Sequence, residues 1–380
     1  MRILGRFRLA AIGGIPIYID WSFWLLVIWI AVSAFWHSGG DWAFVGWRLM
    51  LIVGLVVSVI IHELGHAFAA AAFQIRTRDI TMYPFGGVAS IEKLPEKPLQ
   101  ELVIAIAGPL MNFLIIGFIT AGLLLSGLSW DVNPAYYFSL RRLTIQDYFI
   151  QLAQLNLLLA IFNLIPAFPM DGGRVLRAFL AMRLPHARAT AIAATVGQLF
   201  AVVFALLGLL GNPVLILIGF FVFVAAGNEK KAAEGQSILK GVRAREAVMV
   251  NYPILSATAS LQAAIEALLG SQARSFLIVD PDGRPAGTLS REGIIKALHE
   301  STPPTTPLTE VMDERLITVD ANTELSEVMH ILQEEEVPFV LVTEKVGSST
   351  VILGLIDAEN IAEYLLIKKA REAFAALTNP

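Results

Sequence analysis

The sequence predicts an α-helical membrane protein with six transmembrane helices, followed by a C-terminal α/β domain. Of its 380 residues, 56% are hydrophobic, and the mean hydropathy of +0.66 is typical of a membrane protein. The long apolar runs all precede about Gly227. From Asn228 onward the charges are mixed as in a soluble domain, and one pattern of strands and helices occurs twice, which indicates an internal duplication.

The predicted membrane helices correspond to six apolar segments. A hydrocarbon core about 30 Å thick requires about 20 apolar residues. The last segment is short and needs its polar flanks or a locally thinner bilayer. The first follows a basic N-terminus but has no convincing cleavage site, so we expect a retained helix and not a signal peptide. The segments are residues 19–36, 43–73, 100–126, 147–167, 190–210 and 213–227.

Basic residues in the short connections predict the orientation of these helices. With the N-terminus inside, the inner segments carry eleven Lys and Arg residues, whereas the outer ones carry only Arg141 and Arg142. An even number of spans then places both termini in the cytoplasm. The lack of targeting signals suits a prokaryotic plasma membrane, and the net charge of −4 gives no reason to expect nucleic acid as a partner.

The second apolar segment contains the motif His62-Glu63-Leu64-Gly65-His66. A charge at the centre of a membrane helix costs roughly 2.5–3.5 kcal/mol, so ionisable groups there indicate a functional site. Positions i and i+4 share one face of a helix, which allows His62 and His66 to bind one metal ion. Glu63 lies beside them, where it can accept a proton from a water on the metal. Because the chain has no cysteine, nitrogen and oxygen atoms must supply every ligand.

A catalytic zinc site usually has three protein ligands, and Asp171 is the candidate for the third. It lies in the run NLIPAFPMDGGR, residues 163–174. The two prolines interrupt the helix, and the two glycines after Asp171 allow backbone to approach closely. Both features suit a carboxylate that turns inward. The alternative is that Asp171 is the N-cap of the helix that follows.

The segment Ile80–Ile91 has β-branched residues and a Gly-Gly pair but no helical pattern. Irregular backbone at membrane depth requires protein or a water-filled cavity around it. One interpretation is a short strand or re-entrant loop beside the metal site, with an edge that can receive an extended peptide. The other is an ordinary cytoplasmic hairpin.

Three separated motifs together resemble the site-2 protease family of intramembrane zinc metalloproteases. They are HELGH in the second segment, AGPLMN (residues 107–112) in the third, and NLIPAFPMDGGR after the fourth. The resemblance covers a membrane-embedded domain of residues 1–228. It implies hydrolysis of peptide bonds in single-span membrane proteins within or beside the bilayer.

The resemblance also implies roles for individual residues. One Zn²⁺ per chain would be held by His62, His66 and Asp171, with Glu63 as general acid and base. Asn112 and Asn163 match positions near the site in this family. They would hold the substrate or stabilise the developing oxyanion, or else join helices by hydrogen bonds.

The duplicated unit resembles a tandem pair of CBS domains. A linker of residues 229–244 is expected before the first copy, residues 245–300, and the second copy covers residues 305–370. Such pairs commonly bind adenine nucleotides in the cleft between the copies and regulate an attached module. The resemblance therefore implies that cytoplasmic CBS domains control the protease.

This CBS pair departs from the pattern that binds nucleotides. Where such domains often have a ribose-binding Asp, the copies have Gly293 and Asn360. Ser290 and Asp357 occupy the nearby Ser/Thr position and remain candidates for nucleotide binding. The alternative is a module for homodimerisation or substrate docking that binds no nucleotide.

Two other functions compete with the protease. A CBS-gated membrane transporter would have polar residues along several spans, whereas the ionisable residues cluster around HELGH and DGGR. A catalytically inactive membrane receptor would normally have lost a metal ligand or the glutamate, and all four residues are present. The sequence therefore favours the protease.

Overall fold

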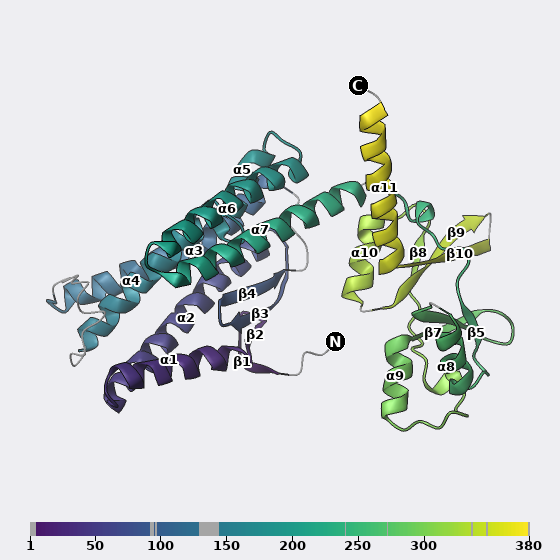
Figure 1. Ribbon diagram of the computed structural model, residues 1–380, viewed down its shortest axis with the longest axis horizontal. Helices are drawn as coiled ribbons and strands as arrows, with labels where there is room; N and C mark the ends of the chain where they lie inside the picture. The colour runs from purple at the N-terminus through teal and green to yellow at the C-terminus, as the bar shows by residue number, and fades with distance from the viewer. Residues whose placement is uncertain are drawn as a thin grey trace. The chain divides into compact units, whose positions relative to one another are not determined.

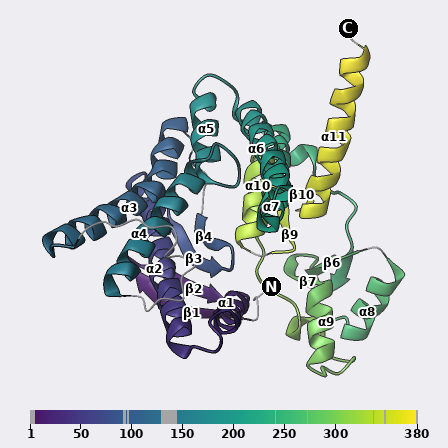
Figure 2. The same ribbon diagram turned by 60° about the vertical axis from the view of Figure 1, so that its left-hand side comes forward.

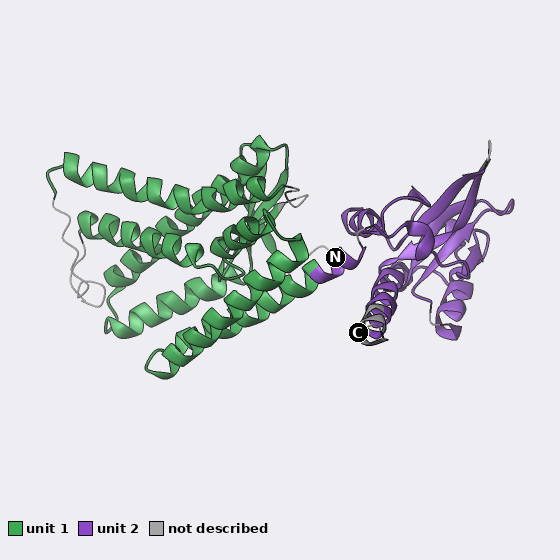
Figure 3. Cartoon of the chain, turned by 90° about the horizontal axis from the view of Figure 1, so that it is seen from above, with its two compact units in different colours: residues 1–233 green, residues 234–380 purple. Residues whose placement is uncertain are grey.

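The chain forms two units, residues 1–233 and 234–380, which are coloured separately in Figure 3. The computed structural model describes residues 5–91, 95, 97–128, 144–239, 241–271, 273–335, 337–346 and 349–378. Arg141 and Arg142, used above to predict the orientation, lie outside the described residues.

The apolar segments of the first unit form helices, because in such runs only the helix satisfies every backbone group internally. A shorter helix, α5, follows the proline-containing loop after α4 (Figure 1). The helices are α1 (Phe23–His37), α2 (Trp42–Ala72), α3 (Pro98–Leu125), α4 (Ile145–Leu164), α5 (Asp171–Ala181), α6 (His186–Leu209) and α7 (Pro213–Leu239).

Within the described residues, five helices are long and apolar enough to cross a membrane: α2, α3, α4, α6 and α7. The sixth expected span corresponds to α1, which has 15 residues and is therefore about 22 Å long. That length is shorter than a typical hydrocarbon core. The expected number of six spans is not confirmed, because the start of the first apolar segment belongs to a β-strand and the helix begins only at Phe23.

Helix α7 is longer than its apolar part. It continues without interruption past residue 227 to Leu239, through most of the residues expected to form a linker. Its final residues, from Glu234 onward, belong to the second unit. Leu239 is buried in the core of that unit.

A four-stranded sheet completes the first unit. Its strands are β1 (Arg6–Ile12), β2 (Ile15–Asp20), β3 (Thr77–Tyr83) and β4 (Gly86–Ile91), in that spatial order. β2 and β3 are parallel, whereas the other two pairs are antiparallel hairpins. Figures 1 and 2 both show the sheet beside α2. Ile17, Ile80 and Met82 of the sheet pack against α2. Their partners there are Ile60, which precedes the histidine motif, and Leu64, which lies within it.

Residues 80–91 have features of both interpretations, a hairpin and a strand beside the candidate metal site. The segment is a regular β3–β4 hairpin, and its second strand lies beside the histidine motif. Among the described residues β4 pairs only with β3, so its other side is an edge of the sheet.

The second unit contains two copies of a three-stranded sheet with helices. In each copy the first two strands are parallel and the third is antiparallel to the second. The first copy contains β5 (Ile254–Ser256), α8 (Leu261–Gly270), β6 (Ser275–Val279), β7 (Pro285–Ser290) and α9 (Arg291–His299). The second contains β8 (Thr318–Asp320), α10 (Leu325–Glu334), β9 (Phe339–Val346), β10 (Ser349–Asp357) and α11 (Ala358–Thr378).

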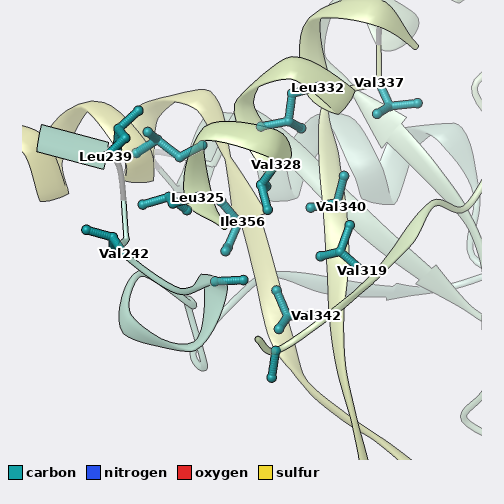
Figure 4. Packing of buried hydrophobic residues seen from close by; sticks show 13 residues of the cluster. Leu239, Val242, Val319, Leu325, Val328, Leu332, Val337, Val340, Val342 and Ile356 are labelled. Carbon is teal, nitrogen blue, oxygen red and sulfur yellow. The ribbon is translucent and has the colours of Figure 1, made fainter. Parts of the chain in front are cut away.

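The two copies are joined by exchanged segments and by a shared apolar contact. Met249, which precedes the first sheet, pairs with Leu355 of β10, and Asp313 pairs with Thr288 of β7. Leu277 of the first sheet packs with Phe339 of the second. The core of the second copy, shown in Figure 4, also buries the end of α7. The two copies therefore form one compact unit.

Candidate metal centre

The His62, His66 and Asp171 side chains converge at one point. The Nε2 atoms of the two histidines are 3.1 Å apart, and Oδ2 of Asp171 lies 3.1 Å from each of them. All three residues are buried, with relative exposures of 4%, 5% and 8%. The structure thus brings together residues 105 positions apart on α2 and α5.

The donor set fits a zinc ion. Zinc binds imidazole nitrogen and carboxylate oxygen at about 2.0–2.2 Å, so tetrahedral ligand atoms lie roughly 3.3–3.6 Å from one another. The observed separations of 3.1 Å are close to this. Three ligands leave the fourth position for water or substrate, which is the arrangement of catalytic zinc sites. No other group of three such residues suited to a metal is found in the part of the chain that the structure describes.

The histidine tautomers also suit metal binding. Nδ1 of His62 lies 2.5 Å from Oδ1 of Asn112, and Nδ1 of His66 lies 2.7 Å from the carbonyl oxygen of Ile104. Both partners are acceptors, so each Nδ1 carries the proton and each Nε2 offers its lone pair to the metal. Such a second hydrogen bond fixes the ring and increases its basicity as a ligand.

Asn112 belongs to a chain of buried hydrogen bonds across three helices. Its Nδ2 donates to Oδ1 of Asn156 on α4 at 3.0 Å. Nδ2 of Asn156 in turn donates to Ser58 Oγ on α2 and to the carbonyl of Leu152. Asn112 thus orients His62 and joins helices, while both of its polar atoms are engaged by protein.

The other asparagine singled out in the sequence, Asn163, is half-buried near the end of α4. The network instead uses Asn156, seven residues earlier on the same helix and fully buried. A signal for Asn156 was present in the sequence, since an asparagine inside an apolar span needs a polar partner.

Asp171 reaches the histidines because α5 packs tightly onto the loop before it. A Cβ atom at Gly172 would overlap the carbonyl oxygens of Leu164 and Ile165, and one at Gly173 would lie 2.7 Å from Phe168 N. Only glycine permits this approach. The N-cap of α5 is Met170, and Asp171 is the first residue of the helix, so Asp171 is not the N-cap considered as the alternative. Its carboxylate is instead directed at the two imidazoles.

One face of α3 lies against the centre. Ile104, Gly108 and Asn112 follow one another at four-residue spacing, which places them on one side of the helix. A Cβ atom at Gly108 would overlap Nε2 of His66 and would lie 2.8 Å from Nε2 of His62. The missing side chain therefore provides the space in which a metal ion fits.

Glu63 lies between the candidate metal ligands and the edge strand β4. A Cβ atom at Gly87 of β4 would be only 2.7 Å from Cγ of Glu63. The carboxylate is thus adjacent both to the two histidines on its own helix and to the backbone of β4. An acid in this place can exchange a proton with a molecule held between the strand and the metal ligands.

The candidate nucleotide residues of the second unit act as helix caps. Ser290 Oγ accepts from the backbone of Gly293, and Asp357 Oδ1 accepts from the backbone of Asn360. Ser290 also lines a cleft of about 950 Å³ together with Asp313. Hydrogen bonds from Arg315 lower the pKa of the Asp313 carboxyl, and the ionised carboxylate is paired with the Arg315 guanidinium.

Comparison with known proteins gives matches for both units. Residues 50–206 match peptidase family M50, and residues 244–300 and 308–367 match the CBS domain. The zinc metalloprotease MJ0392 of Methanocaldococcus jannaschii is 32% identical over 366 residues, which cover 96% of this chain and 97% of that protein. A putative zinc metalloprotease of Synechocystis sp. is 31% identical over 382 residues, covering 94% and 95%.

A solved structure is also similar to part of the chain. The site-2 protease from Methanocaldococcus jannaschii is 36% identical, with a TM-score of 0.44, and the match covers 59% of this chain and 95% of that one.

Proposed function

The chain belongs to peptidase family M50 as a zinc metalloprotease with C-terminal CBS domains, and from this premise we propose that it cleaves single-span membrane proteins within or beside the bilayer. One observation carries the proposal. Two imidazole nitrogens and a carboxylate oxygen meet within 3.1 Å of one another, and the histidines lie on a helix of membrane-spanning length.

The residues around the candidate metal centre have separate roles in peptide hydrolysis. His62, His66 and Asp171 would hold the zinc. When bound, zinc supplies Lewis-acid polarisation of the scissile carbonyl and acidifies the attacking water. Glu63 takes a proton from that water and later delivers it to the leaving amine nitrogen. Asn112 keeps the lone pair of His62 directed at the ligand site.

The edge of β4 gives a physical account of substrate binding. A peptide bond inside a helix is shielded by its own hydrogen bonds, so a membrane-spanning substrate must unwind before it is cleaved. An extended segment added to the open edge of β4 would recover main-chain hydrogen bonds. It would also pass Glu63, which contacts β4 at Gly87.

Proline substitutions in β4 test this account. Successive N–H groups of an antiparallel strand point alternately to its partner and away from it. Of Val88→Pro and Ala89→Pro, we expect one to remove only an outward N–H, leaving the pairing with β3 and the bound zinc intact. That variant should lose about tenfold in kcat/KM, as expected for a main-chain hydrogen bond worth up to about 1.5 kcal/mol.

Val88→Ala, which keeps the N–H, is the matched control and should cleave at nearly the wild-type rate. If both proline variants retain zinc and wild-type kcat/KM, the substrate does not pair with β4.

Removing a ligand tests the metal centre itself. We expect His66→Ala and Asp171→Ala to lower the zinc content of purified protein at least tenfold after dialysis against a chelator, and to abolish cleavage of a single-span substrate. The reason is that two remaining ligands cannot form a catalytic site. Zinc is measured per mole of protein by elemental analysis.

His299→Ala and Asp282→Ala, at exposed positions of the second unit, are controls for the loss of an imidazole and of a carboxylate. Both should retain zinc. Retained zinc together with retained cleavage in Asp171→Ala would rule out its role as a ligand.

We further propose that the protein lies in a prokaryotic plasma membrane with the metal centre toward the cytoplasmic side. The excess of basic residues in the inner connections supports this orientation. Placing both termini in the cytoplasm requires α1 to cross the bilayer as well, which its 15 residues allow only where the bilayer is thinned.

In this proposal the CBS pair regulates the protease from the cytoplasm. The cleft lined by Ser290 offers space for a ligand of nucleotide size, whereas homodimerisation or substrate docking through the pair is the alternative.

A further inference from the structure

A buried ion pair lies outside the metal centre, between α5 and α3. Arg177 and Glu101 each have a relative exposure of 5%. Nη2 and Nε of Arg177 lie 2.5 and 2.6 Å from Oε1 of Glu101. The guanidinium carbon is 5.0 Å from the centre of the Phe168 ring, and Nη1 is 3.6 Å from Glu229 on α7. The guanidinium thus contacts three separate segments of the first unit.

Two of the residues in these contacts lie on either side of Asp171 along the chain. Arg177 follows Asp171 by six residues on α5, and Phe168 precedes it by three residues in the loop. Since the guanidinium holds both α5 and Phe168, it fixes the backbone on either side of Asp171. A hydrogen-bonded guanidinium has defined directions, which an apolar contact lacks.

The partner carboxylate belongs to the face of α3 that supports the histidines. Glu101 precedes Ile104 by three residues and Gly108 by seven, so all three lie on one side of α3. Ile104 accepts the hydrogen bond of His66, and Asn112 on the same face accepts that of His62. The ion pair therefore links α5, which carries Asp171, to α3, the same helix that orients the two histidines.

We propose that Arg177 is a positioning residue for Asp171. Through Glu101 and Phe168 it holds α5 and the preceding loop so that the Asp171 carboxylate stays within reach of both imidazoles. This inference rests on the proposed role of Asp171 as a zinc ligand. Burying a pair of charges costs free energy. A positioning role explains this cost, because metal–ligand distances must be held to within about 0.2 Å.

The test is the zinc affinity of the full-length protein in detergent, measured by competition with a chelator. Arg177→Met keeps a long apolar side chain but loses the charge, and we expect its zinc affinity to fall 10–100-fold, as for other residues that orient metal ligands. Arg177→Lys keeps the charge without the forked geometry and should fall between wild type and Arg177→Met. Unchanged affinity in Arg177→Met would overturn the proposal.

A control separates positioning from general destabilisation. Ile150→Ala removes a buried apolar side chain on α4. We expect it to lower the melting temperature while zinc affinity remains as in wild type. If Arg177→Met does not fold, Glu101→Gln combined with Arg177→Met leaves no buried charge of this pair unmatched, and the same loss of affinity is expected.

A double-mutant cycle decides whether the effect acts through Asp171. In an Asp171→Ala background, Arg177→Met should cause no further loss of zinc affinity, because the ligand that it positions is gone. An equal loss in both backgrounds would make Arg177 merely structural and overturn the proposal. If Asp171→Ala alone leaves zinc affinity unchanged, the ligand assignment itself fails, and this result is distinct from a failure confined to Arg177.

Discussion

Replacing Gly108 by alanine is expected to abolish zinc binding and, with it, proteolysis. The added methyl group would overlap Nε2 of His66 and lie 2.8 Å from Nε2 of His62, in the space where the ligand atoms converge. We expect a loss of zinc affinity of at least 100-fold and no measurable cleavage. Zinc content and cleavage of a single-span substrate in proteoliposomes are the measurements.

The same helix provides the matched controls. Gly117 and Gly122 of α3 have open space where a Cβ atom would lie. Alanine at either position should leave zinc and cleavage unchanged and stabilise the helix by up to about 1 kcal/mol. Because Gly108→Ala gains the same helix propensity, its loss of zinc cannot come from a weakened helix. Normal zinc content in Gly108→Ala would show that this face of α3 does not border the metal.

The second large effect is expected from Glu63→Gln. Glutamine has nearly the same shape but cannot accept and return a proton, so kcat should fall by about 10²–10⁴-fold, the range for general acid–base catalysis. The zinc content should stay at the wild-type level, since the three ligands are untouched. The rate of cleavage is measured in single turnovers of a reconstituted substrate, and the zinc content is measured by elemental analysis.

The combination of results distinguishes Glu63 from the ligands. Loss of zinc in Glu63→Gln would mean that Glu63 supports the metal site, and cleavage at the wild-type rate would mean that another group moves the proton.

The convergence of the three candidate metal ligands could be predicted from the sequence because each of them has a local signal. The two histidines share a helix face through their spacing, and Asp171 stands between helix-breaking prolines and a pair of glycines. The structure brings all three together. The duplicated α/β pattern likewise contained its own strands and helices in order, and family comparison confirms the CBS pair.

The pairings among the supporting residues could not be predicted, because the partners are distant in the sequence. Asn156 and Asn112 are 44 residues apart, and Arg177 and Glu101 are 76 apart. No local pattern specifies such pairs. The strands before α1 were missed for a similar reason, since β2 pairs in parallel with β3 about 60 residues later. A hairpin signal was nevertheless present in Gly13-Gly14 between apolar runs.

The spacing along α3 has a consequence for how this chain can change in length. Each residue turns a helix by about 100°. Inserting or deleting one residue between Glu101 and Asn112 would therefore rotate these two side chains onto different sides of α3. The carboxylate that binds Arg177 and the amide that binds His62 could then no longer face the same side. Exposed positions within this stretch, such as Val103 and Leu110, can exchange one apolar side chain for another. In this stretch the number of residues is constrained throughout, whereas the type of residue is constrained mainly on the buried side of the helix.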